Sequence, residues 1–554
     1  MRSSVRFFLG SSLFFPAAVF AHLLSITATT PFPATIPATS SAMATFTVTN
    51  ISNISVTPVN QTVFPAGSGL AVTSTTCSGL LAPRQSCTMQ VSLQAPPAGR
   101  AVATALKVWA QPSADGVEYP ISFTVTPGLP TITLVPVGHG GLPALRDPIV
   151  ATSNGEWLVL GGSTGGFHDF NSPDFTTNIY VYNPNTAQTY SLSYAAAGVP
   201  LTVQQQLTST EPDFLQDGDT LYIIGGYANL AAGVYTTVNT ITSINIPNAI
   251  ASVKAGTSLA SSIVFRTDIP QFKVTGGQIG KIGNYFYLAF GQDCEGDYCA
   301  ASQTYTNTIY QFTTTPLLTS VNFGNIVTHS DNDGSGWRRR DYTLVPFMQG
   351  GTETLFAMGG PFTPGANAVV WTNGILFDVN INSNQNFINQ QANQYLVPHL
   401  SMYSASSNTS YVATFAGLSN LYWAPSGLKY DNTTPYGNVL DLISLDASGN
   451  VQEYLNLQPL CSGQPLASCL YMGLSAEFIP VADYYDSRDI LQLDQISSTS
   501  PTLVGYVYEG LVSTVQEIFG GPNNATNNTY AVYVTPAGSG ATSWLNVTNL
   551  EPGN

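Results

Sequence analysis

Three stretches of the chain share one pattern: Trp157-Leu-Val-Leu-Gly-Gly162, Leu221-Tyr-Ile-Ile-Gly-Gly226 and Leu355-Phe-Ala-Met-Gly-Gly360. Each is a short apolar run that ends in two glycines, and polar residues follow. Short apolar and aromatic runs bounded by glycine predict strands, and glycine permits the close approach of another backbone at a strand end. The stretches therefore predict the same strand in three copies of one unit.

Three weaker copies of the pattern are apolar runs that end in a single glycine: Phe286-Tyr-Leu-Ala-Phe-Gly291, Val412-Ala-Thr-Phe-Ala-Gly417 and Val504-Gly-Tyr-Val-Tyr-Glu-Gly510. A further strand, often rich in tyrosine, follows most copies, as in Asn178-Ile-Tyr-Val-Tyr-Asn-Pro184. A strand, loop and strand unit repeated at mostly 50 to 70 residues is typical of a propeller built from four-stranded blades. Six copies predict six blades, and the long gap before the last copy leaves seven as the alternative. Residues 130–136 are predicted to add an outer strand that closes the ring.

The composition agrees with an all-β protein. Lysine and glutamate, which favour helices, are scarce, whereas 28 Tyr and 27 Phe favour strands. Only 8% of the 554 residues are charged, against about 25% in a typical soluble domain. The formal net charge of −16 excludes binding to duplex nucleic acid, which requires basic surface. The low charge also excludes a long coiled coil.

Residues 1–21 are predicted to be a secretory signal peptide. Two arginines precede an apolar stretch from Phe7 to Phe20, and Val19-Phe20-Ala21 is an acceptable cleavage site that would leave His22 as the mature start. An uncleaved anchor helix is the alternative, although the stretch is short for a membrane span. No later segment predicts a span. We therefore expect an exported protein that is secreted, periplasmic or bound to the cell surface.

The six cysteines fall into three local pairs: Cys77 with Cys87, Cys294 with Cys299, and Cys461 with Cys469. In an exported protein such pairs predict disulfides. Metal ligation is the alternative, but no histidine accompanies a pair at zinc-like spacing.

Residues 22–128 predict a small β-sandwich, because short alternating strands are separated by turns at the spacing of that fold. The segment from Thr75 to Val91, with its Cys77 loop and Ser86-Cys87-Thr88, resembles bacterial immunoglobulin-like domains. The resemblance implies an immunoglobulin-like domain over 22–128, acting as a spacer or a second binding module.

Residues 131–554 resemble the kelch-repeat family. The diglycines at 161–162, 225–226 and 359–360 and the tyrosine-rich strands carry this resemblance. Three copies lack the full diglycine, and the downstream tryptophan of the strongest kelch consensus is missing. The resemblance implies a secreted bacterial kelch-type β-propeller, like the central domain of galactose oxidase. Copper-radical chemistry on that fold needs a tyrosine–cysteine crosslink, and the paired cysteines argue against it.

In antiparallel four-stranded blades, the segments that lead into each first strand meet around the central channel. Three of the scarce cations are consecutive at Arg338–Arg340, and Arg146 holds the equivalent place in another blade. Arginine can hold a carboxylate with two parallel hydrogen bonds. A structural Arg–Asp pair that links neighbouring blades is the alternative. We expect a ligand-binding site from these segments and one adjacent loop, formed by Arg146, Asp147, His168, Asp169, Asp213, Arg339, Arg340, Asp341, His399 and Glu477.

These features favour a recognition protein that binds a glycan or an extracellular or host protein through one propeller face. The alternative is an envelope enzyme acting on a sugar, since kelch propellers of bacterial envelopes include sugar mutarotases. Its acid or base would be Glu477 or Asp213, with Arg340 as the anchor, because general acid–base catalysis needs a carboxyl group within reach of the substrate. A purely structural envelope role is the third hypothesis. We expect no cofactor, no metal, no nucleic-acid partner and a monomer.

Overall fold

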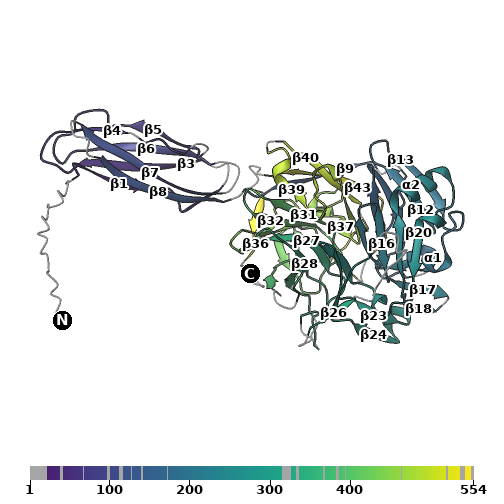
Figure 1. Cartoon of the computed structure of the whole chain (residues 1–554). Helices are drawn as coiled ribbons and strands as arrows, with labels where there is room; N and C mark the ends of the chain where they lie inside the picture. The colour runs from purple at the N-terminus through teal and green to yellow at the C-terminus, as the bar shows by residue number, and fades with distance from the viewer. Residues whose placement is uncertain are drawn as a thin grey trace, which may run out of the picture. The chain divides into compact units, whose positions relative to one another are not determined.

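The computed structural model describes residues 22–550 apart from segments at 38–40, 61, 66–67, 96–99, 112–115, 127, 139–140, 171, 232, 315–325, 332–335, 366–368, 382–385, 394, 463, 499, 509, 519–521, 537–542 and 549. The predicted signal peptide, residues 1–21, lies outside the described residues. The chain forms two compact units, unit 1 ending at Gly128 and unit 2 beginning at Leu129. Strands dominate both units, so the protein is all-β (Figure 1).

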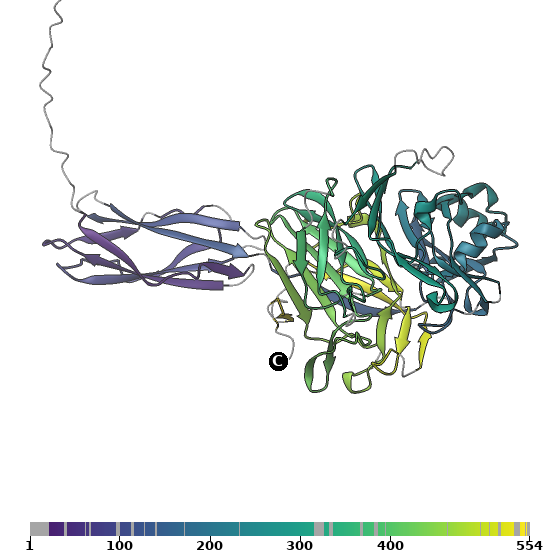
Figure 2. The same ribbon diagram turned by 90° about the horizontal axis from the view of Figure 1, so that it is seen from below.

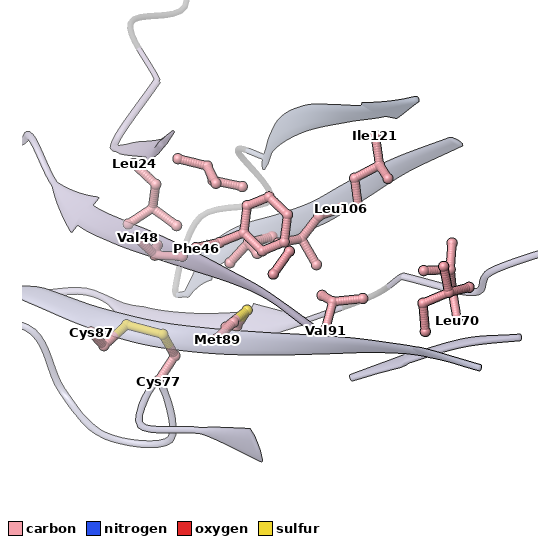
Figure 3. Packing of buried hydrophobic residues seen from close by; sticks show 14 of the residues in the cluster. Leu24, Phe46, Val48, Leu70, Cys77, Cys87, Met89, Val91, Leu106 and Ile121 are labelled. Atoms are coloured by element: carbon pink, nitrogen blue, oxygen red, sulfur yellow. A yellow bond between two sulfur atoms is a disulfide. The ribbon is translucent and has the colours of Figure 1, made fainter. Parts of the chain in front are cut away.

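Unit 1 consists of two four-stranded sheets that enclose one hydrophobic core (Figure 2). One sheet has the order β1 (Leu24–Thr30), β3 (Ser41–Asn50), β6 (Ser86–Gln94), β5 (Leu70–Thr75); the other has the order β2 (Thr35–Pro37), β8 (Gly116–Thr126), β7 (Arg100–Gln111), β4 (Thr57–Asn60). Figure 3 shows Phe46 and Val91 of the first sheet facing Leu106 and Ile121 of the second. These side chains alternate along their strands with more exposed ones, as period-two burial requires.

Unit 2 contains six sheets, and each includes four neighbouring strands that pair antiparallel. Sheet one is β10 (Ile149–Ser153), β11 (Glu156–Leu160), β12 (Asn178–Asn183), β13 (Gln188–Ser193); sheet two is β15 (Asp213–Asp217), β16 (Thr220–Ile224), β19 (Ile241–Asn245), β20 (Ile263–Arg266). Sheet three is β21 (Gln278–Ile282), β22 (Tyr285–Ala289), β25 (Thr308–Phe312), β26 (Val327–Ser330); sheet four is β27 (Thr343–Gln349), β28 (Thr352–Met358), β29 (Asn373–Phe377), β30 (Asn386–Asn389).

Sheets five and six recruit strands from distant parts of the chain. Sheet five is β31 (His399–Ser404), β32 (Thr409–Phe415), β35 (Leu440–Leu445), β36 (Val451–Asn456), flanked by β39 (Leu491–Gln492) and β44 (Trp544–Asn546). Sheet six is β38 (Glu477–Pro480), β40 (Thr502–Tyr508), β43 (Thr529–Thr535), β9 (Thr131–Val137). The first strand of unit 2 thus pairs with its last long strand, from Thr131 opposite Thr535 to Val137 opposite Thr529. This is the outer strand predicted at residues 130–136.

Six hydrophobic clusters lie between consecutive sheets. Sheets one and two share Leu158 and Leu221, and the other clusters join sheets two and three, three and four, four and five, and five and six. The sixth cluster joins sheet six to sheet one, through Tyr508 and Trp157. The six sheets therefore follow one another in cyclic order, and each buries both faces, as their nearly continuous apolar strands require.

The glycine pairs close the second strand of their sheets with left-handed backbone. Gly225 and Gly226 have φ values of 62° and 106°. A Cβ at Gly225 would lie 1.9 Å from the carbonyl oxygen of Val274, which belongs to the segment before sheet three. Phe290–Gly291 and Ala416–Gly417 keep the same two left-handed conformations without the first glycine. These two degenerate copies of the motif therefore preserve its backbone path.

Unit 2 also contains two short helices, several 3-10 turns and three small sheets. Helices α1 (Leu201–Leu207) and α2 (Ile246–Ala255) pack on the cluster between sheets one and two, and the asparagine Asn245 caps α2. Short 3-10 turns are η1 (Ser172–Asp174), η2 (Ala260–Ser262), η3 (Pro270–Phe272), η4 (Asp297–Cys299), η7 (Leu466–Ser468), η8 (Ala482–Tyr484) and η9 (Leu493–Gln495). The remaining strands form three small sheets: β14 (Ser209–Thr210), β17 (Tyr227–Ala231), β18 (Val234–Thr237), β23 (Gln292–Glu295), β24 (Ser302–Tyr305); β33 (Leu421–Ala424), β34 (Gly427–Tyr430); and β37 (Tyr471–Leu474), β41 (Leu511–Ser513), β42 (Asn523–Ala525).

All three predicted cysteine pairs are disulfides: Cys77–Cys87, Cys294–Cys299 and Cys461–Cys469. The first joins β6 to the preceding loop of unit 1, as Figure 3 shows, and the other two brace loops of unit 2. Across the described residues, no helix combines the length and the apolar character that crossing a membrane requires.

Candidate functional site

Six residues at equivalent places, each just before the first strand of its sheet, have left-handed backbone. We call them the mouth ring: Asp147 (φ 50°), Glu211 (51°), Gly276 (63°), Asp341 (50°), Leu396 (50°) and Ser475 (54°). Five of them carry a Cβ, and positive φ is uncommon for such residues because it costs about 1–2 kcal/mol each. The same strained conformation at all six places indicates that the surrounding structure imposes it.

Backbone hydrogen bonds join the mouth ring in cyclic order. Each of five members donates its N–H to the carbonyl of a neighbouring member: Asp147 to Ser475 (3.1 Å), Ser475 to Leu396 (2.9 Å), Leu396 to Asp341 (3.2 Å), Asp341 to Gly276 (2.8 Å) and Gly276 to Glu211 (3.3 Å). Between Glu211 and Asp147 a side chain makes the connection instead. The Thr210 hydroxyl donates a hydrogen bond to Asp147 Oδ2 over 2.9 Å. The left-handed turn aims these five N–H groups at the preceding segment in the ring, so the ring fixes how the six first strands converge.

The mouth ring borders a cavity of about 1040 Å³. First strands of all six sheets line it, and five of the six ring residues do so as well. Pockets for small molecules typically span about 300–1000 Å³, so this volume suits a substantial ligand. Of the predicted site residues, Asp147, Asp213, His399 and Glu477 line the cavity.

Two arginine–aspartate pairs stand at equivalent positions of the ring, in sheets one and four. Arg146 Nη1 lies 2.6 Å from Asp147 Oδ2, and both side chains are buried. Arg146 also donates to Thr210 Oγ1 (3.1 Å) and to the carbonyl of Asp169 (2.7 Å). Arg340 Nη1 likewise donates to Asp341 Oδ2, at a buried carboxylate. Arg146 thus ties the segment before sheet one to the segment before sheet two, which is the contact expected of a structural Arg–Asp pair.

Glu211 and Asp341 approach each other across Gly276. A Cβ at Gly276 would lie 2.2 Å from Asp341 Oδ1 and 3.2 Å from Glu211 Oε2, so only glycine leaves room for the two carboxyl groups. Burial, the charges of Asp341 and Asp147, and a hydrogen bond to Asp341 raise the pKa of Glu211 well above its ordinary value. The protonated form of Glu211 is therefore favoured beside the Asp341 carboxylate, which is paired with Arg340.

Burial favours the neutral forms of three titratable groups at the mouth end of the cavity. Burial and the charge of Asp341 raise the pKa of Asp213 well above its ordinary value. Burial and the charge of Asp147 raise the pKa of Glu477 to about 8. Burial lowers the pKa of His399 to about 4. These three groups thus present neutral hydrogen-bonding atoms to the cavity, because desolvation disfavours their charged forms.

Four residues that line the cavity each have a buried side-chain oxygen without a hydrogen-bond partner: Asp213 Oδ2, Thr343 Oγ1, Ser401 Oγ and Ser475 Oγ. Their residues are 2%, 4%, 3% and 6% exposed. An unsatisfied buried polar group costs about 1–3 kcal/mol, and native proteins contain few of them. The four belong to sheets two, four and five and to the segment before sheet six, so unsatisfied oxygens are gathered around the cavity.

The loop between β11 and β12 lies outside the cavity, against the arginines. Burial and the charges of Arg146 and Arg340 lower the pKa of His168 to about 4. The His168 ring centroid lies 5.4 Å from that of Tyr298 in the Cys294–Cys299 loop. Asp169 contributes its backbone carbonyl to Arg146. The predicted loop residues therefore gather on the outer side of the ring.

Arg339, unlike Arg146 and Arg340, does not pair with an aspartate of the mouth ring. Its side chain is fully buried and donates to the carbonyls of Gly336 (2.9 Å), Gly359 (2.9 Å) and Asn373 (2.7 Å). It braces sheet four, away from the ring. Reasoning from sequence also missed Glu211, Thr343, Ser401 and Ser475. Glu211 had a signal, since it precedes β15 by the same two residues that separate Asp147 from β10.

A metal site is not formed by these acids. Within the part of the chain that the structure describes, no group of three or more His, Cys, Asp or Glu side chains is arranged to hold a metal ion.

Comparison with known proteins adds little. No protein-family model and no curated protein matches the chain. A solved structure of YjhT is 11% identical with a TM-score of 0.34, over 63% of this chain and 91% of that chain. A structure of domains 4–9 of the surface layer protein SbsC is 10% identical with a TM-score of 0.12, over 78% and 82%. At such TM-scores neither similarity assigns a function.

We predict that Gly276→Ala destabilises unit 2 more than Gly283→Ala does. Both glycines have left-handed φ, 63° and 57°, but a Cβ at Gly283 meets nothing within 4 Å. The two variants share the backbone strain, so the excess, about 1–3 kcal/mol, reports the crowding of Asp341 and Glu211. Denaturant unfolding followed by tryptophan fluorescence measures it. Equal losses in the two variants would contradict the carboxyl pair across Gly276.

We also predict that the stability of unit 2 falls as the pH rises from about 4.5 to 8. Glu477 has a pKa of about 8 in the folded protein and about 4.3 when unfolded. Between these values the folded state binds more protons, so raising the pH favours unfolding. Glu477→Gln should make the slope shallower by at most about 1.4 kcal/mol per pH unit. The exposed Glu118→Gln in unit 1 is the control, and an unchanged slope in Glu477→Gln would refute the prediction.

Proposed function

We propose that unit 2 is a six-bladed kelch-type β-propeller and that unit 1 is an immunoglobulin-like sandwich. The cyclic order of the six clusters, the pairing of β9 with β43 and the mouth ring support the propeller. The two sheets around one core and the Cys77–Cys87 loop support the sandwich. The seventh blade is not needed, because the strands in the long interval before the last copy belong to sheets five and six or to two of the small sheets.

We propose further that the protein is exported and binds a glycan in the cavity at the mouth ring. The observation that carries this proposal is the set of four lining residues with an unpartnered buried side-chain oxygen, beside acids whose neutral forms burial favours. Hydroxyl groups both donate and accept hydrogen bonds, so a polyhydroxylated ligand can satisfy all of them. The three disulfides favour an oxidising compartment.

The rest of the cavity wall also suits a sugar. Phe214, Tyr342, Phe478 and Tyr485 line it together with the polar groups. Pockets that bind small molecules combine apolar and aromatic walls with a few convergent polar atoms that fix orientation. A protein ligand would instead require the outer loops around His168 and Tyr298, and this remains an outcome of the test below.

We predict that a glycan array will identify a ligand whose affinity depends on the lining hydroxyls. Thr343→Val and Ser401→Ala should each weaken it by about tenfold, since each removes one hydrogen bond to the ligand. Isothermal titration measures the affinity. Both variants should remain as stable as the parent, because the lost hydroxyls have no partner in the free protein.

Two exposed substitutions serve as matched controls: Thr328→Val on β26 and Ser448→Ala in a turn. They should leave glycan affinity unchanged. Binding that survives both cavity variants would place the ligand elsewhere, and binding of a protein but no glycan would overturn the proposed function.

A second candidate function is the isomerisation of a sugar. Glu477 is protonated at neutral pH and His399 is neutral, and both line the cavity at the starts of neighbouring first strands. Glu477 would donate a proton to the ring oxygen while His399 accepts the proton of the anomeric hydroxyl, and reclosure would exchange the anomers. A pKa near the working pH suits a general acid.

If this second candidate is correct, micromolar protein accelerates anomer exchange of a bound sugar in NMR, and Glu477→Gln abolishes the acceleration. Asp483→Asn, at an exposed site on the neighbouring loop, is the control and should keep full activity. Exchange at the spontaneous rate with a sugar that demonstrably binds would leave binding as the function.

A further inference from the structure

The charges on the cavity wall show what kind of glycan it can accept, an inference that rests on the proposed function. The lining residues include two permanent cations, Lys281 and Arg488. Lys281 Nζ lies 2.5 Å from Asp217 Oδ1. Arg488 forms a salt bridge with Asp486, and its Nε donates to Asp486 Oδ2 over 2.9 Å. Neither cation is without a carboxylate.

The arginines at the mouth are neutralised in the same manner. Arg146 is paired with Asp147, and Arg340 is paired with Asp341. Each partner is the adjacent residue in the chain, and its left-handed backbone is fixed by the mouth ring. A ligand carboxylate could reach either guanidinium only by competing with a carboxylate that is already in place.

The far end of the cavity, where the first strands finish, has an excess of acid. Four lining carboxyl groups, Asp217, Glu353, Asp486 and Asp489, face the two cations Lys281 and Arg488. Burial and the charges of Asp486 and Asp217 raise the pKa of Asp489 to about 6, which still leaves it ionised at neutral pH. An anion that entered from this side would meet net negative charge.

We infer that the glycan bound in this cavity carries no acidic group, because the cations Arg146, Arg340, Lys281 and Arg488 are each paired with a carboxylate and the unpartnered side-chain atoms of the lining residues are hydroxyl and carboxyl oxygens. Bringing a carboxylate into such a site costs its desolvation without a compensating ion pair. A neutral sugar loses no charge hydration and gains the same hydrogen bonds. Arginine thus acts at this mouth as a structural brace for the aspartates.

The test compares matched pairs of sugars: glucose with glucuronic acid, and galactose with galacturonic acid, each as the free sugar and as the terminal residue of an array glycan. In titrations at pH 7, the neutral member of the pair that binds should bind at least about tenfold more tightly. Equal or tighter binding of the acid would overturn this inference and leave the proposed function standing. Failure of every glycan would overturn the proposed function, and this inference with it.

Variants in which an arginine or lysine loses its carboxylate partner test the charge argument directly. Asp341→Asn leaves Arg340 without its carboxylate, and should shift the ratio of neutral to acidic affinity at least about threefold toward the acid. Asp217→Asn, at a more exposed pair, releases Lys281 without disturbing the ring and should act in the same direction. Asp268→Asn, which breaks the exposed pair with Arg266, is the control and should leave the ratio unchanged. A ratio that does not move in either variant, with both proteins folded, would overturn the charge argument.

Discussion

The left-handed mouth ring and its backbone hydrogen bonds determine the geometry of the site. Each ring residue turns its N–H toward the preceding segment, so five bonds tie together loops that are far apart in sequence. The bonds offset the cost of positive φ at five residues that are not glycine. With the ring in place, the first strands of six sheets face one cavity, and the side chains two residues further along, such as Asp213 and Glu477, are held at its wall.

The same ring controls the charges of the site. Asp147 and Asp341 bend back onto the arginines that precede them, which gives each of these two scarce cations a carboxylate partner. Their negative charges in turn favour the neutral forms of Glu477, Glu211 and Asp213. Neutral acids are thus favoured at the mouth end of the cavity, whereas Asp217, Glu353, Asp486 and Asp489 line its far end. The cavity offers many hydrogen bonds, and its two lining cations are paired with carboxylates.

The repeated strands could be predicted from the sequence because periodicity and glycine carry local information. The pattern of Trp157–Gly162 identifies a buried strand without knowledge of its neighbours, and β9 was predictable as an apolar run before the first copy. The positions of Arg146, Asp213 and Glu477 before or at first strands also followed from the repeat. The structure agrees with an all-β chain and three disulfides.

The interactions inside the site could not be predicted in this way. The contact of Glu211 with Asp341 depends on the missing side chain of Gly276, 65 residues from either. Nothing local distinguishes Arg339, which braces backbone carbonyls, from Arg340 beside it. Thr343 and Ser401 look like any strand residues until the cavity leaves their hydroxyls without partners. These features depend on contacts between residues that are far apart in the chain, and a single sequence does not reveal such contacts.

Hydrogen exchange of the ring amides tests the account most directly. The amides of Asp147, Gly276, Asp341, Leu396 and Ser475 should exchange as slowly as those of the buried strands β11 and β28, because they donate hydrogen bonds inside the folded unit. Exchange measured by mass spectrometry on overlapping peptides would reveal this. If the ring amides exchanged as fast as exposed loop amides while β11 and β28 stayed protected, the ring could not be the constraint that shapes the site.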